Sequence, residues 1–346
     1  MVKVLVIDDS VFMRTVIRDI LAKDSSIEVV GTASNGIEAL EKIKSLNPEL
    51  ITLDIEMPKM NGLEVLKELQ SVKKPPKILM LSSLTSKDAE ATTQAIRLGA
   101  DDFMLKPADL PHVREISDEL ISKVKHLVML PAQVVSRKLP ALTGAADRVV
   151  LIGSSAGGPP MLDTLLATLP ADLPAAVVIT QHMPVGFTMP LAERFNRIAT
   201  MPVKETENGD ILENGKILLS KAGVHTIVTA VMAEKGTKTG RIVHTTSPPL
   251  HGVRPAVDKT FESAAQVYGK NVVSVILSGM GNDAGEGALA IKQAGGTNLV
   301  CDEKDCLVYG MARSAIQKKA VDKILPLDKL TKEIERVVLR MEGSRV

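Results

Sequence analysis

Short apolar segments alternate with amphipathic helical segments along most of this chain, and this alternation restricts the possible fold more than any other feature. Strands that alternate with helices form a parallel sheet with helices on both faces. The alternation fills residues 1–127 and begins again at residue 149. We therefore expect an α/β protein with two doubly wound parallel sheets. The apolar segments of the first half are residues 2–7, 28–33, 50–54, 77–82 and 101–105, and those of the second half are 149–153, 175–180, 271–277 and 297–301.

The bulk composition sets limits on size, compartment and partners. A chain of 346 residues with 45% hydrophobic and 24% charged residues has the make-up of a globular protein of about two or three domains. A formal net charge of +1 argues against a broad nucleic-acid or anionic-membrane footprint. No apolar run is long enough to predict membrane insertion, and the two cysteines, which we expect to be free thiols, favour the cytoplasm.

Polar side chains stand where the apolar segments of the first domain end, namely Asp8, Asp9, Asp54, Ser82 and Lys106. The carboxyl ends of parallel strands collect ligands at one edge of a sheet. Three carboxylates gathered there would repel one another, and an oxygen-bound Mg²⁺ offsets that repulsion. Two adjacent aspartates before a helix can also simply complement the helix dipole. Their appearance together at several strand ends favours a metal site.

The same residues resemble the receiver domains of two-component response regulators, from residue 1 to about 127. The matching motifs are Asp8-Asp9-Ser10, Asp54 with Met57-Pro58 and Asn61-Gly62, Ser82, and Lys106-Pro107. The resemblance implies a flavodoxin-like fold in which Asp54 accepts a phosphoryl group from a chemotaxis histidine kinase. It also implies Mg²⁺ bound by Asp9 and Asp54, by Asp8 through water and by the Glu56 carbonyl. Ser82, Phe103 and Lys106 fall at the family's switch positions.

Residues 128–147 lose the alternation, contain Pro131 and Pro140, and are expected to be an interdomain linker. No basic recognition helix follows them, which argues against a DNA-binding output domain. The second domain is expected over residues 148–346. Within it, residues 203–246 are rich in turn motifs such as Asn208-Gly209 and are expected to form hairpins added to the sheet or packed over it.

Residues 149–158 are an apolar segment that ends in small residues and carries Ser155 at the turn into an apolar helical pattern. A sharp strand-to-helix turn of this kind exposes the side chain at its tip, and a serine there is a candidate nucleophile. On this stretch alone, a glycine-rich packing turn or a dinucleotide phosphate loop is equally compatible.

A serine nucleophile needs a base and an acid that orients the base. His182 and Asp283 follow two other apolar segments and are the preferred candidates. His251 is the main competitor for the base, and Asp258 is the alternative acid. Backbone N–H groups near Ala156 and Met280 are candidates for an oxyanion hole.

The second half resembles the catalytic domain of the chemotaxis protein-glutamate methylesterases. The motifs that carry the resemblance are Gly153-Ser154-Ser155-Ala156-Gly157-Gly158, Thr180-Gln181-His182-Met183-Pro184, Val253-Arg254-Pro255 with Asp258, and Gly279-Met280-Gly281-Asn282-Asp283. Ala156, Ala284 and Ala312 depart from the pattern that this family leads us to expect. The first two departures concern the fine tuning of the site and leave the triad intact.

This resemblance implies phosphorylation-regulated hydrolysis of glutamate methyl esters on chemoreceptors, and deamidation of receptor glutamines, by Ser155, His182 and Asp283. It implies no cofactor for the ester hydrolysis itself. Two alternatives of another class are an adaptor that binds receptors without catalysis and a nucleotide-binding regulator that uses residues 153–158.

Overall fold

The computed structural model describes residues 1–82, 91, 94–106, 113–129, 144–233, 236 and 238–341. The chain forms two compact units, Met1–Pro131 and Ala132–Val346. Their division falls inside the predicted linker, most of which lies outside the described residues. Each unit is described by itself. Within the described ranges, no helix is long and apolar enough to cross a membrane.

The first unit contains a parallel sheet of five strands in the order β2-β1-β3-β4-β5. The order changes direction between β1 and β3, so the chain leaves these two strands toward opposite faces and opens a crevice at their carboxyl ends. Its strands are β1 (Val2–Ile7), β2 (Ile27–Ala33), β3 (Leu50–Asp54), β4 (Lys77–Ser82) and β5 (Asp102–Leu105).

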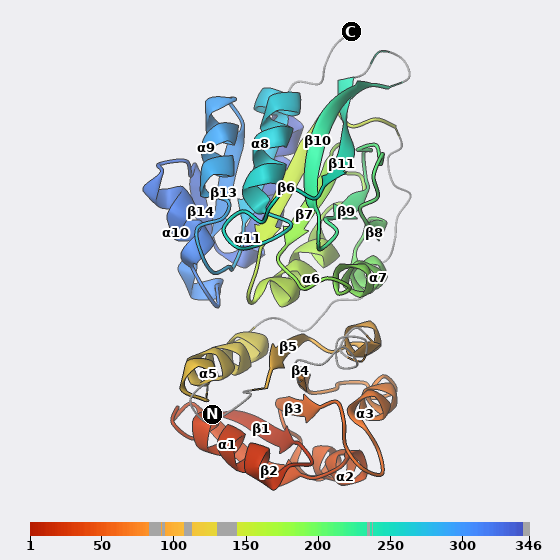
Figure 1. The fold of residues 1–346 in the computed structure, drawn as a ribbon, viewed down its shortest axis with the longest axis vertical. Coiled ribbons are helices and arrows are strands. Elements are labelled where there is room, and N and C mark those ends of the chain that lie inside the picture. The colour runs from red at the N-terminus through yellow and green to blue at the C-terminus, as the bar shows by residue number, and fades with distance from the viewer. Residues whose placement is uncertain are drawn as a thin grey trace. The chain divides into compact units, whose positions relative to one another are not determined.

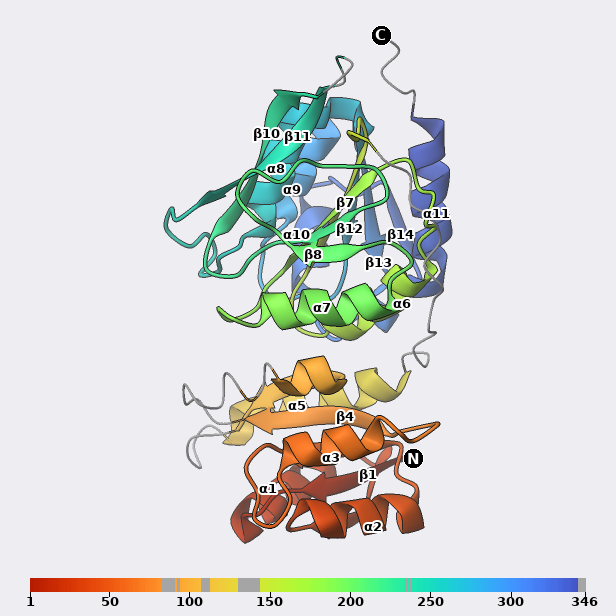
Figure 2. The ribbon, with the colours of Figure 1, turned by 90° about the vertical axis from the view of Figure 1, so that its right-hand side faces the viewer.

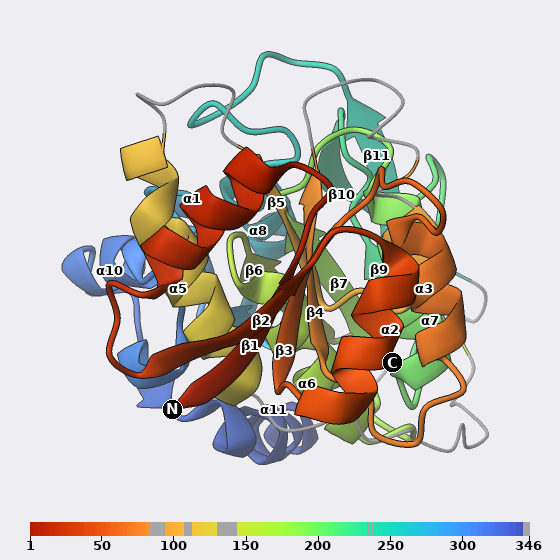
Figure 3. The ribbon, with the colours of Figure 1, turned by 90° about the horizontal axis from the view of Figure 1, so that it is seen from below.

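Helices cover both faces of this sheet, as the alternation predicts. Figure 3 shows α1 and α5 on one face and α2 and α3 on the other. The side chains of Ser10, Asn35 and Asn61 cap the first turns of α1, α2 and α3 by accepting backbone N–H bonds, which fixes where each helix begins. These helices are α1 (Val11–Leu21), α2 (Gly36–Leu46), α3 (Gly62–Leu69) and α5 (Val113–Met129).

The second unit contains a seven-stranded sheet in the order β14-β13-β12-β6-β7-β9-β8, and all its strand pairs are parallel. β6 and β12 are central neighbours, and the chain leaves them in opposite directions along the sheet. The strands are β6 (Val149–Ser154), β7 (Ala176–Gln181), β8 (Val203–Glu205), β9 (Ile217–Leu219), β12 (Val272–Ile276), β13 (Thr297–Cys301) and β14 (Lys323–Leu325).

Helices also flank this sheet on both sides. Figure 2 shows α11 on the opposite side of the sheet from α8 and α9. Phe195 and Phe261 are the largest fully buried side chains of the unit. The helices are α6 (Gly158–Thr168), α7 (Thr188–Ile198), α8 (Val257–Tyr268), α9 (Gly285–Gln293), α10 (Gly310–Gln317) and α11 (Leu327–Arg340), with 3-10 turns at Gly269–Asn271 and Glu303–Asp305.

The turn-rich segment 203–246 differs in part from the expectation of hairpins. Among the described residues of this segment, one antiparallel hairpin forms, from β10 (His225–Met232) and β11 (Lys238–Thr245), and it lies beside α8 in Figure 1. β8 and β9 join the main sheet as parallel strands instead. They are three residues long, so their pairing is set by the strand beside them and is not visible in their own sequence.

Candidate active site and phosphoacceptor site

The acidic side chains of the first unit meet at the carboxyl ends of β1 and β3. These two strands pair directly, with Ile7 beside Leu53, so the residues that follow lie close together. Carboxylate oxygens of Asp8, Asp9 and Asp54 all lie within 4.8 Å of one another. This set of oxygen ligands fits a hard cation such as Mg²⁺.

Lys106 follows β5 and reaches the same cluster. Its Nζ lies 2.8 Å from an Asp8 oxygen and 2.7 Å from an Asp54 oxygen. Burial raises the pKa of Asp54 to about 6, although the bond to Lys106 opposes this shift. Burial also disfavours the charged lysine, but the hydrogen bonds to Asp54 and Asp8 outweigh it and raise the pKa of Lys106.

The other predicted receiver residues are only partly described. Phe103 lies on β5, is half-buried and packs against the core between the sheet and α2 and α3. Glu56 follows β3 and exposes its side chain. The resemblance implies that its backbone carbonyl, and not this side chain, is the metal ligand. Ser82 ends β4, but its side chain lies outside the described residues.

Three adjacent strands of the second unit bring the candidate triad together. β6 lies between β12 and β7, with Gly153 beside Ile276 and Ser154 beside Gln181. Ser155 directly follows β6, His182 directly follows β7, and Asp283 lies in the loop after β12. Residues far apart in the sequence therefore share one edge of the sheet, at the point where the strand order reverses.

Ser155 sits at the tip of the predicted strand-to-helix turn. Its N–H donates to the Ser278 carbonyl at 2.9 Å, and its own carbonyl accepts from the Gly158 N–H at 2.9 Å. Gly157 has a φ of 77°, in the left-handed region that favours glycine. The side chain of Ser155 is half-buried, and its hydroxyl has no hydrogen-bond partner within the described ranges. Among the described residues, the structure therefore shows no hydrogen bond between the Ser155 hydroxyl and His182.

His182 Nε2 lies 2.7 Å from Asp283 Oδ2. This bond leaves Nδ1 as the imidazole nitrogen that can take a proton from a serine. Backbone N–H groups of Val257, Asp258 and Ala284 also donate to the Asp283 carboxylate, at 2.6, 2.8 and 3.0 Å. Two of these belong to the first turn of α8, where the helix dipole favours a negative charge.

These contacts keep the buried Asp283 carboxylate ionised. Burial alone would raise its pKa, but the bond to His182 and the backbone N–H groups outweigh burial and lower it. A buried negative charge that orients an imidazole is what the acid of a serine triad provides.

Two backbone N–H groups remain available for a developing oxyanion. Within the described ranges, the N–H groups of Ala156 and Met280 have no hydrogen-bond acceptor. Ala156 immediately follows Ser155 at the start of the turn into α6, and Met280 lies in the loop after β12 with its side chain exposed. Their availability agrees with the predicted role, which stays a prediction.

Gln181 and Ser278 support the turn and were not singled out from the sequence. Gln181 Nε2 donates to the carbonyls of Ser155 and His182, at 2.9 and 3.0 Å, and its Oε1 accepts from the Ser154 hydroxyl at 2.6 Å. The Ser278 hydroxyl donates to the Ala156 carbonyl at 2.6 Å. Their position in the sequence could have identified them, because each is a polar residue at or just after the end of a buried strand and stands next to His182 or Gly279.

The competing candidates for base and acid pair with each other. His251 Nε2 lies 2.9 Å from Asp258 Oδ2, so His251 forms a second His–Asp pair. His225 bonds the Pro248 carbonyl and the Ala256 N–H, and His244 bonds the Thr206 hydroxyl. These contacts are of the kind that hold a hairpin and its neighbouring loops in place. Cys301 and Cys306 are free thiols, as expected.

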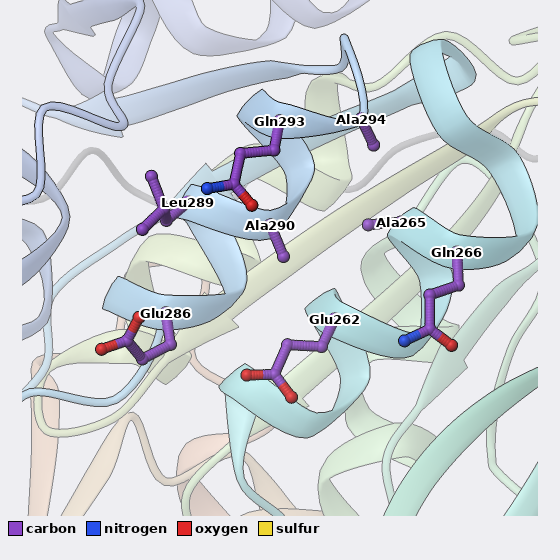
Figure 4. A pocket seen from close by; sticks show the side chains of 8 residues that line it. All are labelled: Glu262, Ala265, Gln266, Glu286, Leu289, Ala290, Gln293 and Ala294. Atoms are coloured by element: carbon purple, nitrogen blue, oxygen red, sulfur yellow. The ribbon is translucent and has the colours of Figure 1, made fainter.

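A pocket of about 600 Å³ lies between α8 and α9 and is separate from the triad. Figure 4 shows Glu262 and Glu286 at one end of it and Gln266 and Gln293 farther along the same two helices. None of the triad residues lines it.

Comparison with known proteins identifies both units. The family model described as CheB methylesterase matches residues 150–334, and the response regulator receiver domain model matches residues 4–118. The catalytic domain of Thermotoga maritima CheB methylesterase superposes with a TM-score of 0.52 at 37% identity, covering 55% of this chain and 98% of that chain.

Two relatives match over nearly their whole length. The protein-glutamate methylesterase/protein-glutamine glutaminase 1 of Methanospirillum hungatei is 55% identical over 345 residues, or 99% of this chain and 100% of that protein. The corresponding protein of Symbiobacterium thermophilum is 40% identical, over 97% of each chain. The chain therefore belongs to the CheB methylesterase family and carries a response regulator receiver domain ahead of its methylesterase domain.

Proposed function

We propose that this chain hydrolyses glutamate methyl esters on chemoreceptors with Ser155 as nucleophile, His182 as base and Asp283 as the acid that orients His182. Family membership confirms the predicted enzyme class, protein-glutamate methylesterase. The observation that carries the residue assignment is that the three residues follow adjacent strands of one sheet, with His182 and Asp283 bonded at 2.7 Å.

The geometry supports acyl transfer in two steps. Ser155 Oγ attacks the ester carbonyl while His182 Nδ1 takes the hydroxyl proton, and the N–H groups of Ala156 and Met280 stabilise the oxyanion. The C–O bond to methoxide breaks, and His182 returns the proton so that methanol leaves. Water then attacks the acyl-serine by the same proton transfers and releases a glutamate carboxylate and Ser155. A receptor glutamine would react in the same way and release ammonia.

Phosphorylation of Asp54 is proposed to stimulate this activity, with a histidine kinase as phosphodonor. Asp9 and Asp54 would hold Mg²⁺, with Asp8 acting through water and the Glu56 carbonyl as a further ligand. The ion would neutralise negative charge on the phosphoryl group during its transfer. Lys106, now bonded to Asp54 at 2.7 Å, would then pair with an oxygen of the new phosphoryl group.

Replacing the nucleophile tests the proposed reaction. Ser155→Ala should lower methanol release from methylated receptors by about 10⁴-fold or more, because no other group can form the acyl intermediate. Ser71→Ala, at an exposed position after α3, is the matched control and should keep the wild-type rate. Methanol is measured by gas chromatography. A Ser155→Ala rate close to wild type would reject the assignment.

A further inference from the structure

His251 and Asp258 form a second His–Asp pair, and the proposed reaction assigns no role to it. Asp258 is fully buried in the first turn of α8, and its Oδ1 accepts the Gly287 N–H of α9 at 2.7 Å. Its Oδ2 lies 2.9 Å from His251 Nε2. His251 belongs to the loop before α8 and keeps about a third of its side chain exposed, at 35%. The pair therefore links a buried carboxylate to a proton donor in contact with solvent.

This pair lies directly against the acid of the triad. Ligand atoms of His251, Asp258 and Asp283 all lie within 4.8 Å of one another. The backbone N–H of Asp258 also donates to Asp283 Oδ1 at 2.8 Å. Asp258 thus holds Asp283 with its backbone while its side chain places a second carboxylate beside it.

Two buried carboxylates at this distance compete for negative charge. Asp283 accepts three backbone N–H bonds and one from His182, whereas Asp258 accepts one backbone N–H and the His251 bond. The difference in donors makes Asp283 the better place for a charge. In agreement, burial and then the neighbouring Asp283 raise the pKa of Asp258 to about 6, although the Gly287 N–H opposes this.

We propose that His251 and Asp258 are a positioning pair that shares a proton, so that the pair adds no net charge beside the Asp283 carboxylate that His182 needs. When Asp258 is ionised, a protonated His251 compensates it. When Asp258 is protonated, no compensation is needed. In both states the His251–Asp258 pair adds no net charge beside Asp283. The proposed function gives this inference its catalytic meaning, because it assigns the base to His182.

The neighbouring elements carry further titratable and charged groups, and several of these have partners of their own. On the far side of Asp283 lies His182, from the loop after β7. Glu286 of α9 pairs with Lys318 at 2.6 Å, and Arg254 donates to the carbonyls of Thr246 and Ser247. His225 of β10 accepts the Ala256 N–H, as described above. Lys259 and Glu262 continue α8 beyond Asp258. We therefore expect the titration of His182 to respond mainly to Asp283 and the pair.

The test measures the titration midpoint of the His182 imidazole by NMR in the full chain, with the signal assigned by its loss in His182→Gln. Asp258→Asn keeps the shape of the side chain and removes the carboxylate, so a proton on His251 is no longer compensated and the midpoint should fall by roughly half a pH unit. His251→Gln removes the proton donor, so an ionised Asp258 is no longer compensated and the midpoint should rise by a similar amount. A purely structural role predicts no such opposite shifts.

Asp172→Asn is the control for charge removal, because Asp172 is exposed and precedes β7 at the opposite edge of the sheet. It should leave the midpoint unchanged. Unchanged midpoints in Asp258→Asn and His251→Gln, or shifts in the same direction, overturn the inference. If Asp258→Asn fails to fold, as judged by circular dichroism, the result with the partly exposed His251→Gln decides alone.

Methanol release separates this inference from the proposed function. Active wild-type protein with unshifted midpoints rejects the positioning pair alone. Inactive wild-type protein with oppositely shifted midpoints rejects the proposed reaction and leaves the pair established. If the proposed reaction and the positioning pair are both correct, the midpoint of the acidic limb of the pH profile of kcat/KM should shift together with the His182 midpoint in each variant.

Discussion

Asp258 and Asp283 show how strongly the local donors decide the charge of a buried carboxylate. Both are almost fully buried, and both touch the first turn of α8. Burial disfavours ionisation of each, yet the pKa of Asp283 is lowered and that of Asp258 is raised. The bond to His182 and then the larger number of backbone N–H donors stabilise the charged form of Asp283, and the Asp283 charge in turn disfavours ionisation of Asp258.

This difference predicts how folding stability depends on pH. The pKa of Asp258 is about 6 in the folded protein against an ordinary value of 3.8. Its stabilising contribution is therefore complete below pH 3.8 and is lost as pH rises through about 6. Relative to Asp258→Asn, the wild type should lose at most ~3 kcal/mol of unfolding free energy from pH 4 to 7. Urea unfolding at several pH values measures it, and a constant difference would contradict it.

Single candidate site residues could be predicted from the sequence where a recognisable motif coincides with the end of an apolar segment. Ser155, His182 and Asp283 each close a recognisable apolar segment, so their shared edge followed from the parallel topology. The bond between His251 and Asp258 did not follow, because it depends on how the loop before α8 folds back. The contacts of Gln181 were not predictable for a similar reason, because its amide bonds Ser154 and Ser155, which only strand pairing brings near.

The turn between β6 and α6 carries the proposed nucleophile, and it leaves no room for an added methyl group at Gly158. A Cβ there would lie 2.3 Å from Gln181 Oε1 and 2.8 Å from Ser154 Cβ. The Gln181 side chain is held on both of its polar atoms, so it cannot simply move away. Close packing thus ties the position of Ser155 to the identity of residue 158.

Gly158→Ala should therefore destabilise the unit by about 1–3 kcal/mol and lower kcat at least about 10-fold, because Ser155 shifts. Ala167→Gly in the same helix is the matched control. It should cost about 1 kcal/mol through helix propensity and leave kcat unchanged. Thermal unfolding and methanol release measure both effects. Equal kcat values in the two variants would show that the turn tolerates the displacement.

Strands of five or six residues could be predicted from the sequence, and strands of three residues could not. The strands at Leu50–Asp54, Lys77–Ser82 and Thr297–Cys301 have the predicted bounds, because their apolar runs are bounded by polar or turn residues. The three-residue strands β8, β9 and β14 carry too little pattern of their own. Their strand state comes from pairing with a neighbour in the sheet.

The whole chain joins a response regulator receiver domain to a methylesterase domain, and the proposed regulation is the property that needs both units. Asp54→Asn should abolish the stimulation of methanol release by a small phosphodonor with Mg²⁺ and leave the basal rate, because the acceptor lies in the other unit. Asp19→Asn, at an exposed position paired with Arg18, is the matched control and should keep full stimulation. Stimulation that survives in Asp54→Asn would place the acceptor elsewhere.

The central claim is that Ser155 is a nucleophile activated by His182, and covalent labelling tests it most directly. The full chain is treated with a serine-reactive phosphonate, and the modified residue is located by peptide mass spectrometry. We predict a single label on Ser155, formed at least about 100-fold more slowly in His182→Gln. An adaptor without catalysis and a nucleotide-binding regulator both predict an unlabelled Ser155. That result, or a label on another serine, would contradict the account.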